Sequence, residues 1–268
     1  MKTMFFSTFI FGLFFAVYFL MGLPLQSLAQ QSAGNSDPMQ QAAKMANITR
    51  DWLNGKLSTP ETSGEMHEVK RSNESGQLIV MYDLIVKGAT RDQTYSLLAW
   101  PINATSPSQQ MKGLTISEDG VLVCTGKGSE QCVGDKENGR VGFVFSQPGQ
   151  GEVFRFALVS ADGKTKMFFA AIPDPIIQTS QTCSLEVVRL MPKFELVLVR
   201  AKGYQPNEDL LLASKSYDES HDQQVKADSE GSYVSALLTG VKDRKNGKAT
   251  LSLKGGGCAP ELSFEWGK

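Results

Sequence analysis

The sequence has 268 residues and balances 27 Lys and Arg against 28 Asp and Glu. Such a balance does not provide the basic surface that nucleic-acid binding requires, so we expect no nucleic-acid partner. The length fits one large β domain, or two domains of ordinary size once an N-terminal leader is subtracted.

The N-terminus has the pattern of an export leader. Lys2 precedes an uncharged, Phe-rich stretch at residues 4–23, and the helix breaker Pro24 follows it. Residues 27–29 (Ser-Leu-Ala) carry small side chains at both positions that an exporting peptidase reads. We therefore predict a cleaved signal peptide over residues 1–29. The alternative is an uncleaved anchor, because the apolar stretch is about long enough to cross a ~30 Å hydrocarbon core, and only then would a membrane be a partner.

The four cysteines agree with export. Cys124, Cys132, Cys183 and Cys258 are an even number, so in an exported chain we expect disulfides and a secreted or periplasmic location. Zinc is the alternative, but the sequence has no C-x-x-C pair. Of the three possible pairings we predict Cys124 with Cys132 and Cys183 with Cys258, because only this pairing keeps each bridge inside one block of strands.

Residues 30–76 are rich in Gln, Ser, Asn, Thr and Glu, which is typical of a polar, poorly packed tail. One helix is predicted within it, at about residues 38–54, because Asp37 can cap its first turn and Gly55 can end it. The apolar stripe of this helix is weak. We expect a loosely packed spacer, and the alternative is a hydrophobic docking helix in which Trp52 is the only large aromatic residue.

Residues 77–175 alternate apolar and polar side chains, as half-buried strands do. Asp-Gly turns at residues 117–120 and 161–164 separate short apolar runs, a pattern typical of β-hairpins. We predict a β-sandwich domain over residues 77–175. Its first strand places a set of apolar side chains on one face: Leu78, Val80, Tyr82, Leu84 and Val86.

Arg155 stands between Phe154 and Phe156. An arginine flanked by aromatic residues could be a functional cation on an exposed aromatic surface. A strand with one solvated face gives the simpler interpretation, in which both Phe side chains point inward and Arg155 faces water. We predict the simpler arrangement.

The proline-containing stretch at residues 172–183 is predicted to be a hinge between two blocks of strands. Residues 176–268 hold seven short apolar runs, and this number indicates a second, immunoglobulin-like β-sandwich domain. Alternation in the last run points Trp266 inward, so we expect Trp266 to anchor the second core. The protein as a whole is predicted to be mostly β, with two tandem sandwiches preceded by a signal peptide and a short helix in a polar tail.

The two blocks also resemble each other. A polar turn at residues 88–95 matches one at residues 203–210, and the turn at residues 117–120 matches one at residues 228–231. We take an internal duplication as a hypothesis. It predicts the same strand order in both blocks.

Residues 203–208 (Gly-Tyr-Gln-Pro-Asn-Glu) and 227–233 (Ala-Asp-Ser-Glu-Gly-Ser-Tyr) resemble the pattern of immunoglobulin-like modules in bacterial secreted and surface proteins. Together with the end at residues 258–267, the arrangement is similar to uncharacterised exported bacterial proteins. The resemblance implies a β-sandwich fold and a bacterial source, and it brings no catalytic residues. The Cys, Trp and Cys spacing of antibody domains is absent.

The chain offers few residues for catalysis. Its two histidines are His67, in the polar tail, and His221, in an acidic segment that we interpret as a hairpin loop. Neither accompanies a nucleophile elbow. The set Asp218, Glu219, His221 and Asp222 could bind a divalent cation, but it lacks regular calcium-loop spacing, so a solvated turn is favoured. We expect no metal and no cofactor.

These observations predict an exported, non-catalytic binding or structural protein of the cell envelope or extracellular space, with an unknown protein or glycan partner. The alternative is a secreted hydrolase or carbohydrate-active protein with a cleft built from loops. That alternative depends on the acidic segment at residues 218–222 and on Trp100, which could stack on a sugar but would more simply fill a core.

Overall fold

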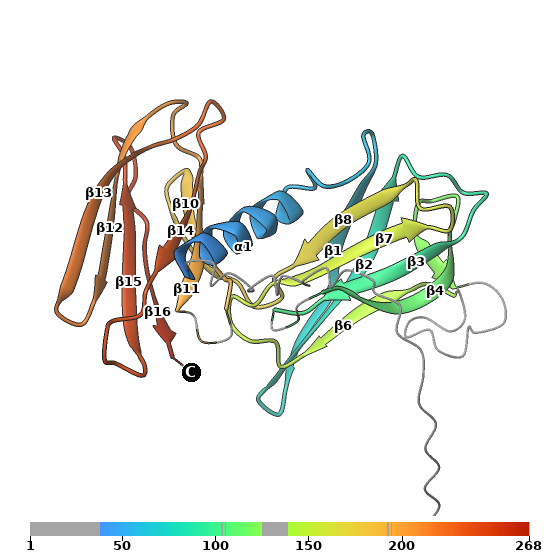
Figure 1. Ribbon diagram of the computed structural model, residues 1–268, viewed down its shortest axis with the longest axis horizontal. Helices are drawn as coiled ribbons and strands as arrows, with labels where there is room; N and C mark the ends of the chain where they lie inside the picture. Colours follow the sequence, from blue (N-terminus) through green and yellow to red (C-terminus); the bar gives the residue numbers. More distant parts are fainter. Residues whose placement is uncertain are drawn as a thin grey trace, which may run out of the picture. The chain divides into compact units, whose positions relative to one another are not determined.

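Antiparallel β-strands make up most of the described chain, as the sequence predicted (Figure 1). This computed structural model describes residues 38–267 apart from 103, 105, 125–138, 192 and 194, and it leaves out the side chains of residues 38–43. The predicted signal peptide at residues 1–29 therefore lies outside the described residues. The elements are α1 (Pro38–Leu53), β1 (Ser63–Glu74), β2 (Gln77–Lys87), β3 (Tyr95–Trp100), β4 (Ser108–Ile116), β5 (Leu122–Cys124), β6 (Gly142–Ser146), β7 (Phe154–Ser160), β8 (Lys166–Ala171), β9 (Ile176–Ser180), β10 (Cys183–Arg189), β11 (Leu196–Lys202), β12 (Asp209–Ser216), β13 (Glu219–Lys226), β14 (Tyr233–Leu238), β15 (Gly247–Lys254) and β16 (Glu261–Trp266).

The first β-sandwich pairs a three-stranded sheet, β1-β2-β6, with a five-stranded sheet, β5-β4-β3-β7-β8. One face of each sheet supplies a shared apolar core. Phenylalanines dominate this core: the Phe143 ring meets the Phe156 ring edge-on at 5.0 Å between centroids, and Phe156 stacks on Phe169 at 5.7 Å. The predicted Asp-Gly hairpins lie between β4 and β5 and between β7 and β8.

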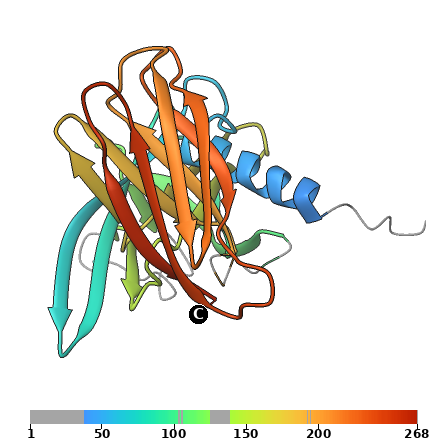
Figure 2. The same ribbon diagram turned by 90° about the vertical axis from the view of Figure 1, so that its left-hand side faces the viewer.

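The second sandwich pairs the sheet β14-β11-β10-β9 with the sheet β13-β12-β15-β16, whose orange and red strands run side by side in Figure 2. All seven predicted runs are strands, and β9 is an eighth. Counted from β10, the first, second and fifth strands are β10, β11 and β14, and they share one sheet. The third, sixth and seventh are β12, β15 and β16, and they share the other, as in an immunoglobulin constant domain. The fourth strand differs, because β13 pairs with the third strand, β12, and not with the fifth. Trp266 is 1% exposed and anchors this core as predicted.

The two sandwiches have the same strand order. The order β1-β2-β6 in one corresponds to β10-β11-β14 in the other, and β4-β3-β7-β8 corresponds to β13-β12-β15-β16. Each sandwich then adds one strand of its own, β5 in the first and β9 in the second. This agreement is what the duplication hypothesis predicted.

The prediction that residues 30–76 form a polar tail is wrong beyond α1. Ser63–Glu74 is strand β1, which pairs along its length with β2 and belongs to the first sandwich. Its side chains are polar because β1 is an edge strand with mostly exposed residues, so its sequence lacks the apolar alternation of β2. Charged edge strands are a common protection against unwanted strand pairing.

The hinge predicted at residues 172–183 is also wrong in its second half. Ile176–Ser180 is strand β9, which forms a hairpin with β10 through Gln181 and Thr182. Two prolines and the polar residues 178–182 indicate a hinge, yet an outer strand with one exposed face tolerates such residues. Strand β9, which starts at Ile176, therefore belongs to a sheet of the second sandwich.

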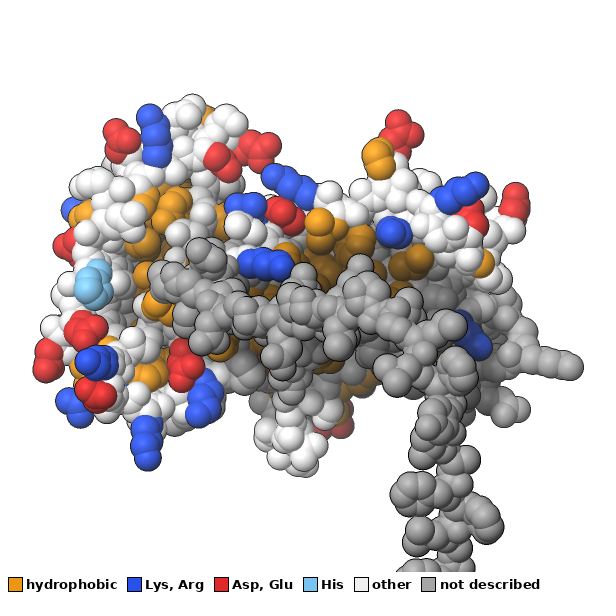
Figure 3. All heavy atoms as spheres, in the orientation of Figure 1, with side chains coloured by type: hydrophobic (Ala, Val, Ile, Leu, Met, Phe, Trp, Pro, Cys, Tyr) orange, Lys and Arg blue, Asp and Glu red, His pale blue; other side chains and the backbone are white. Residues whose placement is uncertain are grey.

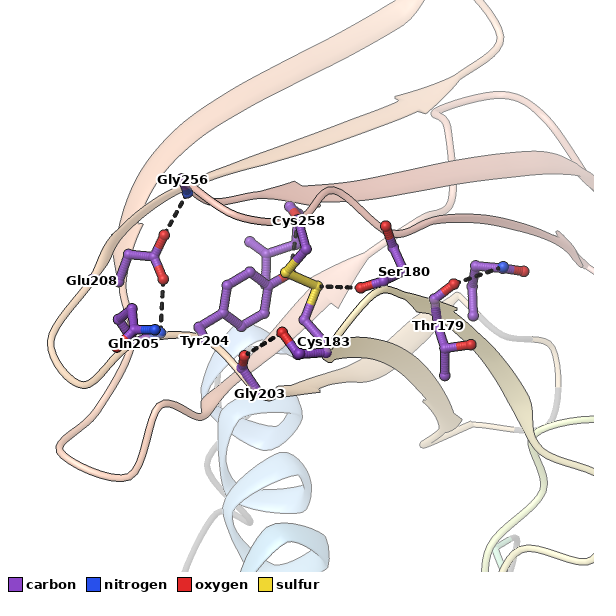
Figure 4. The surroundings of a disulfide bond; sticks show 12 residues. Thr179, Ser180, Cys183, Gly203, Tyr204, Gln205, Glu208, Gly256 and Cys258 are labelled. Carbon is purple, nitrogen blue, oxygen red and sulfur yellow. Dashed lines mark hydrogen bonds between the residues drawn. A yellow bond between two sulfur atoms is a disulfide. The ribbon is translucent and has the colours of Figure 1, made fainter.

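A disulfide closes the second sandwich (Figure 4). It joins Cys183, at the start of β10, to Cys258, which precedes β16, and the two lie 75 residues apart in sequence, as predicted. Beside it the buried Tyr204 hydroxyl donates a hydrogen bond to the Leu253 carbonyl at 2.8 Å. Cys124 is also disulfide-bonded. Its predicted partner Cys132 lies outside the described residues, so that pairing stays a prediction.

Candidate functional site

A groove of about 490 Å³ runs between helix α1 and strand β14. Ala46, Asn47 and Arg50 of α1 form one wall. The opposite wall is apolar apart from a single serine, and β11 and β14 supply it. Its residues are Leu196, Leu198, Val234, Ser235, Ala236, Leu237 and Leu238. The volume lies within the ~300–1,000 Å³ that small-ligand sites usually have.

Helix α1 is held firmly on its other side. The indole nitrogen of Trp52 donates hydrogen bonds to the carbonyl oxygens of Phe156 and Phe169, both at 2.9 Å. These two carbonyls belong to neighbouring strands, β7 and β8. Trp52 is 3% exposed and Thr49 1%, so α1 is not the loosely packed spacer that the weak stripe suggested.

Arg155 lies beneath α1, and the prediction that it faces water is wrong. Only 2% of it is exposed, and its guanidinium group sits 4.6 Å over the Trp100 ring. Its nitrogens donate to the carbonyls of Trp100 and Pro101 at 3.3 Å and to the Thr49 hydroxyl at 3.5 Å. Burial lowers the pKa of Arg155 to about 10, which leaves it charged at neutral pH. Both Phe neighbours do point into the core, as predicted.

Helix α1 also touches the second sandwich. Ala46 belongs to a buried apolar cluster with Val188 of β10 and with Leu196 and Leu198 of β11. Val153, which precedes β7, completes the link from the first sandwich. One helix thus covers an outer surface of each sandwich, and the groove lies along its contact with the second.

Strand β14 forms the other side of the groove and is an edge strand. It pairs with β11, and no other described strand pairs with it. The Thr239 amide donates to the Glu195 carbonyl at 3.0 Å, which fixes the alternation of hydrogen bonds along the pair. Tyr233, Ser235 and Leu237 therefore direct their backbone polar groups toward β11. The backbone groups of the intervening residues point away from the sheet: Val234, Ala236 and Leu238.

The groove edge is uncharged. Residues 232–241 contain no Lys, Arg, Asp or Glu, although charged residues make up 21% of the chain. Elsewhere acidic and basic side chains are interspersed over the described part of the face in Figure 3. The edge strand of the opposing sheet, β13, carries Glu219, Asp222 and Lys226. Leu238, at the end of β14, is 53% exposed.

The residues singled out for metal binding do not converge. Tyr217 and Asp218 form the tight turn between β12 and β13, whereas Glu219, His221 and Asp222 lie on β13 itself and not in a loop. Among the described residues, no three His, Cys, Asp or Glu side chains come together to hold a metal ion. The cavity that Glu219 and His221 help to line measures about 40 Å³, far smaller than a substrate site.

The other residues considered for chemistry have structural surroundings. His67 lies on β1, with its Nε2 atom 3.3 Å from a carboxylate oxygen of Glu65 on the exposed surface. The Trp100 indole donates to the Ala104 carbonyl at 2.9 Å, and its ring packs against Trp52 at 5.6 Å between centroids. Trp100 therefore supports α1, and this role agrees with the expectation that it fills a packed space.

A second cavity, of about 500 Å³, lies beside Ile176 at the start of β9. Arg189 and Lys248 give it positive charge, but Glu265 lines it too and stands directly opposite Lys248 across β15 and β16. The opposite charges leave no clear preference for a ligand of either sign. The groove at β14 therefore remains the stronger candidate.

Comparison with known proteins adds no family. No protein-family model matches the chain, and no curated protein matches it. Among solved structures, a transglutaminase from red sea bream is similar with a TM-score of 0.24 and 8% sequence identity, over 78% of this chain. The chain spans 31% of the length of that protein. A likeness of this degree indicates neither a shared fold nor a shared activity.

One further observation concerns membranes: none of the helical structure in the described residues is both long and apolar enough to span a bilayer. The groove itself went unrecognised at the level of sequence. The helix and β14 were each predicted, but nothing local indicates that they lie together. The sequence does contain an uncharged run at residues 232–241, but the edge strands β6 and β9 are uncharged too, so this run alone does not indicate a groove.

Proposed function

We propose that this chain is an exported, non-catalytic binding protein that holds a partner protein in the groove between α1 and β14. The observation that carries the proposal is an apolar groove of about 490 Å³ beside a sheet edge whose outward backbone groups no described strand pairs with. Apolar surface that borders unpaired backbone groups is the kind of surface that other chains bind.

Three features support export. The first residues of the sequence have the pattern of a bacterial signal peptide. The Cys183–Cys258 disulfide is typical of proteins that fold in an oxidising compartment such as the periplasm or the extracellular space. The immunoglobulin-like strand order is common in secreted and surface proteins that bind other molecules. A secreted or periplasmic binding protein accommodates all three.

Site-specific photo-cross-linking tests the proposed function. A photoreactive amino acid at the exposed position Asn47 places the probe in the groove, and the same residue at exposed Lys112 on β4 is the matched control. With cell-envelope extract, we expect an adduct from position 47 that position 112 does not give. Leu238→Asp, which puts a charge on the exposed wall, should abolish the adduct. Identical adducts at both positions, or an adduct that survives Leu238→Asp, would contradict a groove-bound partner.

A further inference from the structure

We infer that the groove takes an extended segment of its partner, which adds to the sheet as a new strand beside β14. This inference rests on the proposed function and specifies the partner. The first argument is the backbone. Val234, Ala236 and Leu238 each present an N–H and a C=O away from β11, and another strand in register would pair with all of these groups in one regular ladder.

The side chains of the same three residues specify the partner further. Tyr233 and Leu237 pack against the core of the second sandwich, whereas Val234 packs against the cluster that contains Ala46 of α1. Because side chains alternate along a strand, Val234, Ala236 and Leu238 all stand on the face that α1 partly covers. Residues of an added strand that exchange hydrogen bonds with these three would have their side chains on that face too.

The partner segment should therefore carry an apolar side chain at every second position. Those side chains would lie along the groove, beside Leu196 and Leu198, which are buried at 3% and 1% exposure. The side chains between them would lie on the opposite face of the sheet. A groove-bound helix would instead leave the outward amides of β14 without a regular set of acceptors.

The charge pattern distinguishes β14 from the edge strands β1 and β13. The edge strands β6 and β9 are uncharged as well, and β14 is the uncharged edge that borders the groove. β1 and β13 carry charged side chains along their length, which discourages strand addition. The edge of β8 is protected differently, because the Thr59 amide donates to the Lys166 carbonyl and the Phe168 amide donates to the Ser58 hydroxyl. Over residues 232–241, β14 has no charged side chain to protect it.

Peptide selection against the full chain tests this inference. The probe is a library of random eight-residue peptides displayed on phage. Enriched peptides should alternate apolar with other residues, and a synthetic copy should slow amide exchange of Val234, Ala236 and Leu238 at least tenfold at saturation. Ala236→Pro removes an outward N–H without touching the bonds to β11, and Ala236→Lys adds an edge charge; both should lower affinity at least tenfold.

The controls separate the two proposals. Circular dichroism and thermal unfolding of the Ala236 variants establish that they fold, and the photoreactive group at position 47 reports whether the peptide occupies the groove. If the peptide cross-links at position 47 but exchange of the three amides is unchanged, strand addition is wrong and the groove proposal stands. If no enriched peptide cross-links there, the groove proposal itself fails. Concentration-dependent dimers in sedimentation that protect the same amides without peptide would identify a second copy as the occupant and overturn a separate partner.

Discussion

The two sandwiches share a strand order but differ in what covers the same row of side chains. The polar turns before β3 and β12 place Tyr95 and Leu210 in equivalent positions. Five residues after each of them lie Trp100 in the first sandwich and Lys215 in the second. The cross-strand neighbours of Trp100 are Arg155 and then Ala170, and those of Lys215 are Thr250 and then Ser263, so the two rows of side chains correspond. In the second sandwich this row is polar, and the Thr250 and Ser263 hydroxyls lie 3.0 Å apart on the exposed surface.

In the first sandwich the equivalent row is covered by α1, and Arg155 is buried there. The comparison teaches that alternation along a strand separates two faces but does not reveal whether the outer face meets water. A helix that precedes the sandwich in sequence decides this for Arg155. The following predictions test how far the two sandwiches behave alike.

The largest expected effect concerns the disulfide. Replacing Cys183 and Cys258 together by Ala should lower the free energy of unfolding of the second sandwich by about 4.5 kcal/mol, because a bridge over this many residues restricts the unfolded chain. Denaturant titration can follow each sandwich separately, since Trp266 reports the second and Trp52 with Trp100 report the first. Single-tryptophan variants make the assignment direct. Equal losses from both sandwiches, or no loss, would contradict the prediction.

A matched pair of glycines tests the shared architecture. Gly88 follows β2 and Gly203 follows β11, and both have positive φ angles, 70° and 86°. A Cβ atom would collide with the Glu61 carbonyl at Gly88 and with the Thr182 carbonyl at Gly203. These carbonyls lie just before β1 and β10, which are the corresponding strands of the two sandwiches. Gly88→Ala and Gly203→Ala should each cost about 3 kcal/mol.

Chemical denaturation with the same fluorescence readout measures both variants. Each variant should destabilise its own sandwich more than the other one. Gly113→Ala is a useful control, because its φ of 72° is equally unfavourable but a Cβ there meets no atom within 4 Å. If Gly88→Ala were no worse than Gly113→Ala, the close contact would not be a common constraint of the two sandwiches.

A smaller effect, of opposite sign, is expected at Arg155. Arg155→Met keeps much of the volume and removes a buried charge with no carboxylate partner among the described ion pairs, so the free energy of unfolding should rise by about 1 kcal/mol. Burial lowers the pKa of Arg155 to about 10, so the charged form is the disfavoured one in the folded state. The gain in stability from Arg155→Met should therefore be complete at neutral pH and should shrink as the pH rises above about 10, the pKa of Arg155.

Thr250→Met at the equivalent position of the second sandwich is the control for Arg155→Met. Its side chain faces water, and the change in stability should stay within about 0.5 kcal/mol. Urea unfolding at pH 7 and pH 10.5 compares the two variants. A large loss on Arg155→Met would mean that the guanidinium contacts outweigh its desolvation.

The smallest effect is expected on the charged edge of the first sandwich. Arg71 donates to both carboxylate oxygens of Glu68 on β1, at 2.9 and 2.6 Å, and this hydrogen bonding holds the pKa of Glu68 below its ordinary value of 4.5. The pair is exposed, so Arg71→Met should cost about 0.5 kcal/mol. This loss of stability should be present above pH 4.5, where Glu68 is ionised, and should vanish as the pH falls through the lowered pKa of Glu68. Unfolding experiments at pH 7 and pH 3 measure the difference. An equal cost at both values would argue that Arg71 contributes through packing or through its hydrogen bond to the Pro173 carbonyl, at 2.8 Å.

Features fixed by neighbouring residues were predictable from sequence. Helix α1 begins and ends within a residue of the predicted bounds, because the sequence signals used to predict its ends, Asp37 and Gly55, lie next to them in the chain. The seven strands of the second sandwich were predicted for the same reason, since turn residues and alternation lie close together in the chain. The pairing of Cys183 with Cys258 followed from the division of the chain into two blocks of strands.

Features that depend on distant contacts were not predictable in this way. The polar sequence of β1 gives no sign of a strand until β2 is known to need an edge partner. Arg155 looked solvent-facing because the helix that covers it lies more than a hundred residues earlier. The groove needs α1 and β14 together, and neither sequence indicates the other. For the candidate site, the sequence supplied both walls but not their juxtaposition.

The disulfide described above also sets how the chain would respond to mechanical tension. A protein pulled by its ends can lengthen only where the covalent path is free to straighten. The bridge from Cys183 to Cys258 removes 75 residues from that path, which is about 250 Å of extended chain. Under tension the second sandwich would therefore transmit force through the sulfur atoms and release only its outer segments, β9 and β16. The groove wall that β11 and β14 supply would stay inside the closed loop.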